Sequence, residues 1–189
     1  MPIYSCSSLS TPRLQSVPSQ PSLRPFDIAV ALRLLLVPED RYEPLAAALA
    51  TSTSAVHRSV ARLQQSGLCV RGRRTIVKAA FREFLMHGMR YSFPAVIGAE
   101  REGVATATAH PEVARVVNGQ NEAAPFVWAR EGGSVRGTSL VPLFPGVLEV
   151  AARDPRMHEL LATVDVLRSG GDGARRAVGD SLASRFLQD

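Results

Sequence analysis

The chain has few of the residues that form cross-links, metal sites or membrane spans. Its 189 residues include two cysteines, Cys6 and Cys69, and neither belongs to a Cys-x-x-Cys or Cys/His cluster. The sequence therefore indicates neither a zinc site nor a disulfide framework, and a reducing, cytoplasmic compartment fits this cysteine usage. No apolar run approaches the roughly 18 residues needed to cross a bilayer, so we expect no membrane partner.

The motifs that mark common enzyme classes are also missing. Histidines occur at four scattered positions, His57, His87, His110 and His158. There is no Gly-x-Ser-x-Gly or His-Glu-x-x-His motif. Asp165 and Arg168 are three positions apart on a predicted helix, a spacing typical of an ordinary ion pair. We therefore expect no catalytic residues, no metal and no cofactor, and an enzyme is the least favoured interpretation.

Basic residues are plentiful, but Lys78 is the only lysine, and the net charge is +5. The preference for arginine, together with abundant alanine, indicates a GC-rich, bacterial genome. Between Thr53 and Arg90 eight basic residues stand against one acid, Glu83, which gives this stretch a charge of +7. The basic residues are Arg58, Arg62, Arg71, Arg73, Arg74, Lys78, Arg82 and Arg90. Such a local patch is typical of a surface that contacts phosphates, although a solvated basic face is the alternative.

The basic stretch begins in a pair of predicted helices. A short alanine-rich helix within residues 41–50 is followed by a polar turn and by a longer helix that starts near residue 54. Ser52 can cap the longer helix and Gly67 can end it. Its apolar face consists of Val56, Val60 and Leu63, and its outward positions are Thr53, Ser54, His57, Arg58, Ala61 and Arg62. Residues 69–77 then place two β-prone pieces around a basic, glycine-containing turn.

Residues 26–90 resemble the winged helix-turn-helix of bacterial transcription regulators, MarR-like in the broad sense. The resemblance implies that the longer helix lies in the major groove and that the basic turn is the wing. It implies a sequence-specific regulator of double-stranded DNA, a homodimeric repressor. The implied DNA-binding residues are Thr53, Ser54, His57, Arg58, Arg62, Arg71, Arg73 and Arg74. Because some relatives sense oxidants with a cysteine, Cys69 is either a redox sensor or a small buried residue.

The sequence as a whole predicts a mainly α protein with a small β-wing, that is, a winged helix-turn-helix domain plus a C-terminal helical region. Residues 1–24, rich in serine and proline, predict a disordered tail, and residues 25–91 the winged domain. Residues 92–146 are rich in glycine and proline and predict an irregular connecting segment. Within it, short strands are expected at 113–117, 125–129 and 139–143. Trp128 belongs either to the core or to a ligand pocket.

Residues 147–189 predict a C-terminal helical hairpin for dimerisation or partner binding. Asp154 and Pro155 are typical of a helix start. Residues 26–77 can close a small domain by themselves, so the apolar stripes of the 79–91 helix and of the hairpin need a partner surface. We therefore expect a homodimer, and a chain ending at Gly146 should fold and bind DNA more weakly. A DNA-binding antitoxin, or another component of a two-gene module that binds a partner protein, is the alternative.

Overall fold

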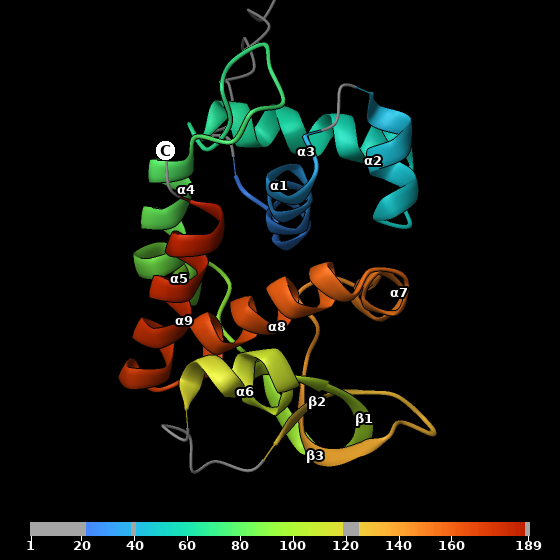
Figure 1. The fold of residues 1–189 in the computed structure, drawn as a ribbon. Coiled ribbons are helices and arrows are strands. Elements are labelled where there is room, and N and C mark those ends of the chain that lie inside the picture. Colours follow the sequence, from blue (N-terminus) through green and yellow to red (C-terminus); the bar gives the residue numbers. More distant parts are fainter. Residues whose placement is uncertain (1–21, 39–40, 119–124, 188–189) are drawn as a thin grey trace, which may run out of the picture.

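A computed structural model describes residues 22–38, 41–118 and 125–187 (Figure 1). Over these residues the protein is mainly helical with one small three-stranded sheet, which confirms the coarse fold class. The elements in chain order are α1 (Pro25–Leu36), α2 (Tyr42–Ala48), α3 (Thr53–Gln65), α4 (Lys78–Glu83), the π-helical η1 (Phe84–Gly88), α5 (Met89–Ser92), β1 (Ile97–Thr106), the 3-10 turn η2 (Ala107–Ala109), α6 (Pro111–Val117), β2 (Phe126–Ala129), β3 (Val135–Leu140), α7 (Val147–Arg153), α8 (Pro155–Ser169) and α9 (Asp172–Phe186). Residues 1–21 of the predicted tail, with Cys6, lie outside the described residues.

The N-terminal helices α1, α2 and α3 pack together at one end of the molecule (Figure 1). α1 begins at Pro25, the first residue of the predicted winged domain, and its residues 28–32 are fully buried. α3 is capped by Ser52, whose Oγ accepts a hydrogen bond from the Ala55 N–H at 3.3 Å. Gly67 follows α3 with a φ of 78°, a left-handed conformation that glycine adopts without steric cost. The capping and the apolar face predicted for α3 are therefore confirmed.

α8 lies between the N-terminal helices and the sheet (Figure 1). Asp154 caps it by accepting hydrogen bonds from the backbone N–H groups of Arg156 and Met157 at 2.9 and 3.2 Å. Every residue from 160 to 167 is buried, and α8 contacts α1, α5, α6, α7, α9 and β1. Because these elements bury the apolar residues of α8, the premise that its apolar stripe needs a second molecule is wrong.

The sheet lies in residues 97–140, within the segment that the sequence predicts to be irregular. β1 pairs antiparallel with both β2 and β3, and β2 pairs parallel with β3, so the three strands close on themselves. Closure needs close backbone approach, since a Cβ on Gly103 or on Gly137 would overlap the carbonyl oxygen of Trp128 or of Pro125. The strand predicted at 125–129 is confirmed as β2. The strand predicted at 113–117 is wrong, because α6 occupies these residues.

The predicted helix over residues 78–91 forms as α4, η1 and α5 in succession. Its apolar stripe, with Phe81, Leu85 and Met89, is buried. η1 contacts α8 and α9, and α5 contacts α8, so this stripe also finds its partners within the chain. The described helices and sheet thus share one continuous hydrophobic core.

Candidate functional site

The outward face of α3 carries most of the polar residues that the sequence predicts for DNA contact. Thr53, Ser54, His57 and Arg58 are exposed, while Val56, Ser59 and Val60 on the opposite face are buried. Helical periodicity alone explains this division, because α3 packs against α1 and α2 on one side only. The exposed face therefore presents short hydrogen-bonding side chains and one arginine, Arg58, to solvent.

Arg62 does not belong to that face. Its Nε donates to Asp27 Oδ2 at 2.8 Å and its Nη2 to Asp27 Oδ1 at 2.6 Å. The Asp27 side chain is fully buried and also accepts from the Arg24 N–H at 2.8 Å. The hydrogen bonds to Asp27 raise the pKa of Arg62 above its ordinary value. The Arg62 guanidinium therefore neutralises a buried carboxylate and ties α3 to the start of α1, and its contact with DNA stays a prediction.

Residues 69–77, which we call the 69–77 hairpin, project from the end of the molecule that carries α3 (Figure 1). Among the described residues its strand pairing is a single antiparallel bridge, Cys69 with Ile76. The Val70 N–H donates to the Thr75 carbonyl at 2.9 Å, and Gly72 at the tip has a φ of 72°. Three arginines lie in the turn, Arg71 and Arg73 exposed and Arg74 partly buried. The predicted basic turn exists, with strands of minimal length.

The turn of the 69–77 hairpin is held against the body of the protein. The carbonyl oxygen of Arg73 accepts from Gln64 Nε2 of α3 at 2.7 Å and from the Cys69 thiol at 3.2 Å. Cys69 is 2% exposed, and burial raises the pKa of its thiol. A buried, protonated thiol is a poor nucleophile, so the structure supports the small buried residue over the redox sensor.

Tyr42, at the start of α2, brings two of the predicted residues together. Its ring stacks on the His57 ring, with centroids 4.5 Å apart and planes inclined by 29°. The Arg74 guanidinium carbon lies over the same ring, 4.8 Å from its centroid. Sequence reasoning missed Tyr42. The available signal was an aromatic residue at the head of an otherwise alanine-rich helix.

A second polar cluster lies in the interior. Asp165 accepts hydrogen bonds from Thr106 Oγ1 at 2.8 Å, from Trp128 Nε1 at 2.7 Å and from Arg168 Nη1 at 2.7 Å. The side chains of Arg168 and Asp165 are 4% and 1% exposed, so this is not the ordinary ion pair that the sequence predicts. Arg168 also donates from Nε to the Phe93 carbonyl at 2.9 Å.

The interior cluster therefore joins α8, β1, β2 and the segment that leads into β1. Burial raises the pKa of Asp165, while the charge of Arg168 and the hydrogen bonds from Thr106 and Trp128 act to lower it. Trp128 is 1% exposed, which places it in the core rather than in a ligand pocket. Since each of these groups is engaged by another and none faces solvent, the cluster is a structural one.

Two of the histidines that are scattered in the sequence meet in the structure. His110 and His158 make an edge-to-face contact with ring centroids 4.4 Å apart. His158 Nε2 donates to the Ala105 carbonyl at 2.9 Å, whereas the buried Nδ1 of His110 has no hydrogen-bond partner among the described residues. Burial lowers the pKa of both imidazoles. The pair is consequently neutral at pH 7 and forms part of the packing between α8 and the start of α6.

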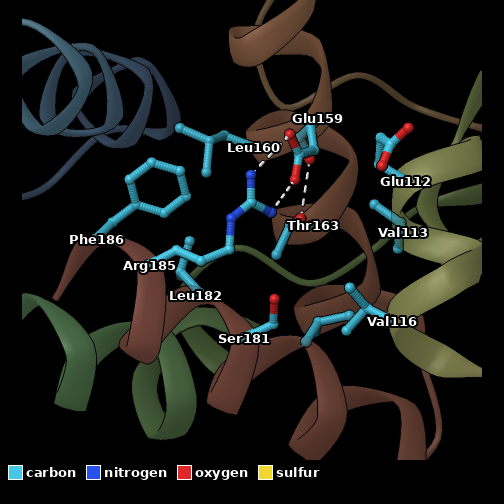
Figure 2. Close-up of a pocket in the computed structure, with 11 residues that line it drawn as sticks. Glu112, Val113, Val116, Glu159, Leu160, Thr163, Ser181, Leu182, Arg185 and Phe186 are labelled. Atoms are coloured by element: carbon cyan, nitrogen blue, oxygen red, sulfur yellow. Dashed lines mark hydrogen bonds and ion pairs between the residues drawn. The ribbon is translucent and has the colours of Figure 1, made fainter.

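One of the hollows among the described residues lies between α6, α8 and α9. Figure 2 shows that the Arg185 side chain reaches across it to Glu159, among apolar side chains that include Val113, Val116 and Leu182. The second bond of this ion pair, Nη2 to Oε2, measures 3.3 Å. The space left for the centre of a water-sized sphere is ≈ 10 Å³, which suffices for one water molecule. This hollow is a packing seam and not a ligand site.

Two further observations concern the described residues. No helix among them is long and apolar enough to cross a membrane. No group of three or more histidine, cysteine, aspartate or glutamate side chains in these parts of the chain is placed to hold a metal ion. Comparison with protein-family models, with curated proteins and with solved structures found no match to this chain.

Proposed function

We propose that the protein is a sequence-specific regulator that binds double-stranded DNA, a homodimeric repressor of the winged helix-turn-helix, MarR-like kind. The observation that carries the proposal is the continuity of one surface. The exposed face of α3 and the basic turn of the 69–77 hairpin lie side by side and are linked through Tyr42. Within this proposal α3 enters the major groove and the hairpin is the wing.

The side chains on that surface suit the two tasks of a DNA-binding protein. Arg58 can donate two hydrogen bonds to O6 and N7 of guanine, and Ser54 can contact a base edge or a phosphate. Arg71 and Arg73 are exposed on a protruding turn, where they can meet phosphates or enter the minor groove. The stretch from Thr53 to Arg90 stays strongly basic without Arg62, because seven basic residues still face Glu83 alone.

A dimer is part of the proposal because one such surface makes few base contacts, and two copies related by a two-fold axis read two half-sites. The alternative is a two-gene module whose partner protein binds the C-terminal hairpin. It is less favoured, because the apolar residues of α8 are already buried within the chain. Sedimentation of the full-length chain at micromolar concentration checks the dimer, and a monomer would reject it.

The experiment that tests DNA binding is an electrophoretic mobility titration at several salt concentrations. Duplexes selected from a random pool should be retarded. A plot of the logarithm of the affinity against the logarithm of the salt concentration should be a falling straight line, with a slope of about −0.9 for each phosphate contacted. The double variant Arg71→Ala/Arg73→Ala should have a shallower slope. Arg176→Ala, a change at an exposed site on α9, is the control and should keep the wild-type slope. If no duplex is retarded even at low salt, the proposal fails.

A further inference from the structure

The ring of Tyr42 is the place where three separate elements of the proposed DNA surface meet. Tyr42 begins α2, His57 lies in the second turn of α3, and Arg74 lies in the turn of the 69–77 hairpin. The two contacts, 4.5 Å from the imidazole and 4.8 Å from the guanidinium carbon, are both within the range of stacking and cation–π interactions. One side chain thus touches both the helix and the hairpin.

The hairpin needs such a contact, because its own structure is slight. A single bridge pair and a few backbone hydrogen bonds hold it, and an isolated two-stranded hairpin is marginally stable in water. Gln64 holds the carbonyl of Arg73 from the α3 side. Tyr42 holds the next residue, Arg74, from the α2 side. The turn is therefore anchored at two successive residues by two different helices.

We infer that Tyr42 is a positioning residue that sets the spacing between the hairpin and α3, so that both meet DNA as one preformed surface. This inference rests on the proposed function. When the spacing between the helix and the hairpin is fixed, both can bind their grooves at once only on DNA whose contact points have the same spacing. A mobile hairpin would still attract phosphates by charge. Its ordering on a specific site, however, would cost conformational entropy and so reduce the affinity for that site. Tyr42 therefore contributes to the preference for a specific site more than to charge-driven binding.

The ring carries this role, and not the hydroxyl, because both contacts are made with the ring. Tyr42→Phe keeps the ring and should behave as wild type. Tyr42→Leu keeps an apolar side chain but has no π face, and Arg74→Lys keeps the positive charge but loses the planar group that stacks. Both of these variants should loosen the hairpin.

The test combines a DNA measurement with one that needs no DNA. Fluorescence anisotropy gives the affinity for the selected duplex and for a scrambled duplex of equal length. Tyr42→Leu should lower the affinity for the selected duplex by about threefold to tenfold, a loss typical of one ring contact, and leave the scrambled duplex within twofold. Hydrogen exchange, measured without DNA, should become faster at the Val70 and Arg73 N–H groups and stay unchanged in α1 and α8.

The possible results separate clearly. Faster exchange in the hairpin together with a lost preference, both restored in Tyr42→Phe, supports the inference. Unchanged exchange in Tyr42→Leu overturns the positioning role even if the protein binds DNA. Equal losses in Tyr42→Phe and Tyr42→Leu also overturn it, because they would assign the effect to the hydroxyl. If the wild type binds no duplex, the proposed function fails and the inference with it, whatever the exchange data show.

Discussion

Arg58 and Arg62 lie one helical turn apart on α3, and their surroundings give them different roles. Arg58 is exposed, whereas Arg62 neutralises the fully buried Asp27. Arg62→Gln should lower the free energy of unfolding by about 3–5 kcal/mol, because it leaves a buried charge without its partner. Urea titration measures this loss.

Arg58→Ala is the matched control for that substitution. It should change the free energy of unfolding by no more than about 0.5 kcal/mol, as is usual for a surface site. On the selected duplex it should cost about 1–3 kcal/mol and relax the preference for sequence. If Arg62→Gln proves as stable as Arg58→Ala, the structural role given to Arg62 is wrong.

The buried histidine pair predicts a dependence of stability on pH. Burial lowers the pKa of His110 and His158 below the ordinary 6.5, while Glu112 and Glu159 act to raise that of His110. The unfolded chain therefore takes up protons near pH 6.5, where the folded chain does not. The free energy of unfolding should fall as the pH is lowered through this value, down to the lowered pKa of each folded imidazole.

Urea titrations between pH 7.5 and 5 test the histidine pair. His110→Gln/His158→Gln removes both imidazoles, and a glutamine at 158 can still donate to the Ala105 carbonyl. The wild-type curve should slope downward toward acid, and the curve of the double variant should be flatter over the same range. Parallel curves would assign the slope to other groups.

Among the elements, most helices and the strand β2 could be predicted from the sequence, whereas the helix α6 and the closed three-stranded sheet could not. Ser52, Gly67 and Asp154 act within one helical turn of themselves, so their capping roles are visible in the local sequence. The sheet depends on contacts between distant residues, such as the approach of Gly103 to Trp128. The first six residues of β1 are all exposed, so no alternation of apolar and polar residues marks the strand.

The candidate site divides in the same way. The exposure of Thr53, Ser54 and Arg58 follows from helical periodicity. The commitment of Arg62 to Asp27 does not, because the carboxylate lies 35 residues earlier in the chain. The stacking of Tyr42 on His57 likewise joins two helices whose packing the local sequence leaves open. Local periodicity predicts which way a side chain points, but not what it meets there.

The interior cluster around Asp165 should make α8 and the sheet depend on one another. Asp165→Asn removes the charge that faces the buried Arg168, and the free energy of unfolding should fall by about 3–5 kcal/mol. Glu112→Gln breaks the exposed ion pair with Arg115, also at a spacing of three, and should cost no more than about 0.5 kcal/mol. Thermal or urea unfolding gives both values, and similar losses would show that the buried pair has no special role.

For the whole molecule, the position of α8 reverses an expectation drawn from the sequence. A chain ending at Gly146 would lack α7, α8 and α9, and thus the helix that covers α1, α5 and the sheet. It would also leave Thr106 and Trp128 without the carboxylate they donate to. We expect this truncated chain to be unfolded or aggregated, whereas the full-length chain unfolds cooperatively. Circular dichroism with size-exclusion chromatography decides, and a cooperative unfolding transition of the truncated chain would contradict the single shared core.

The glycines at the closure of the sheet form a sequence pattern by which distant homologues can be recognised. No larger side chain fits at Gly103 or at Gly137, and Gly133 is equally tight because its Cβ would overlap the backbone of Gly103. Selection should conserve glycine at these three positions while the sequences of the exposed loops around them diverge. We expect lineages that share this fold to keep one glycine near the middle of the chain and, about thirty residues later, two more that are four positions apart, long after the rest of their sequences have diverged.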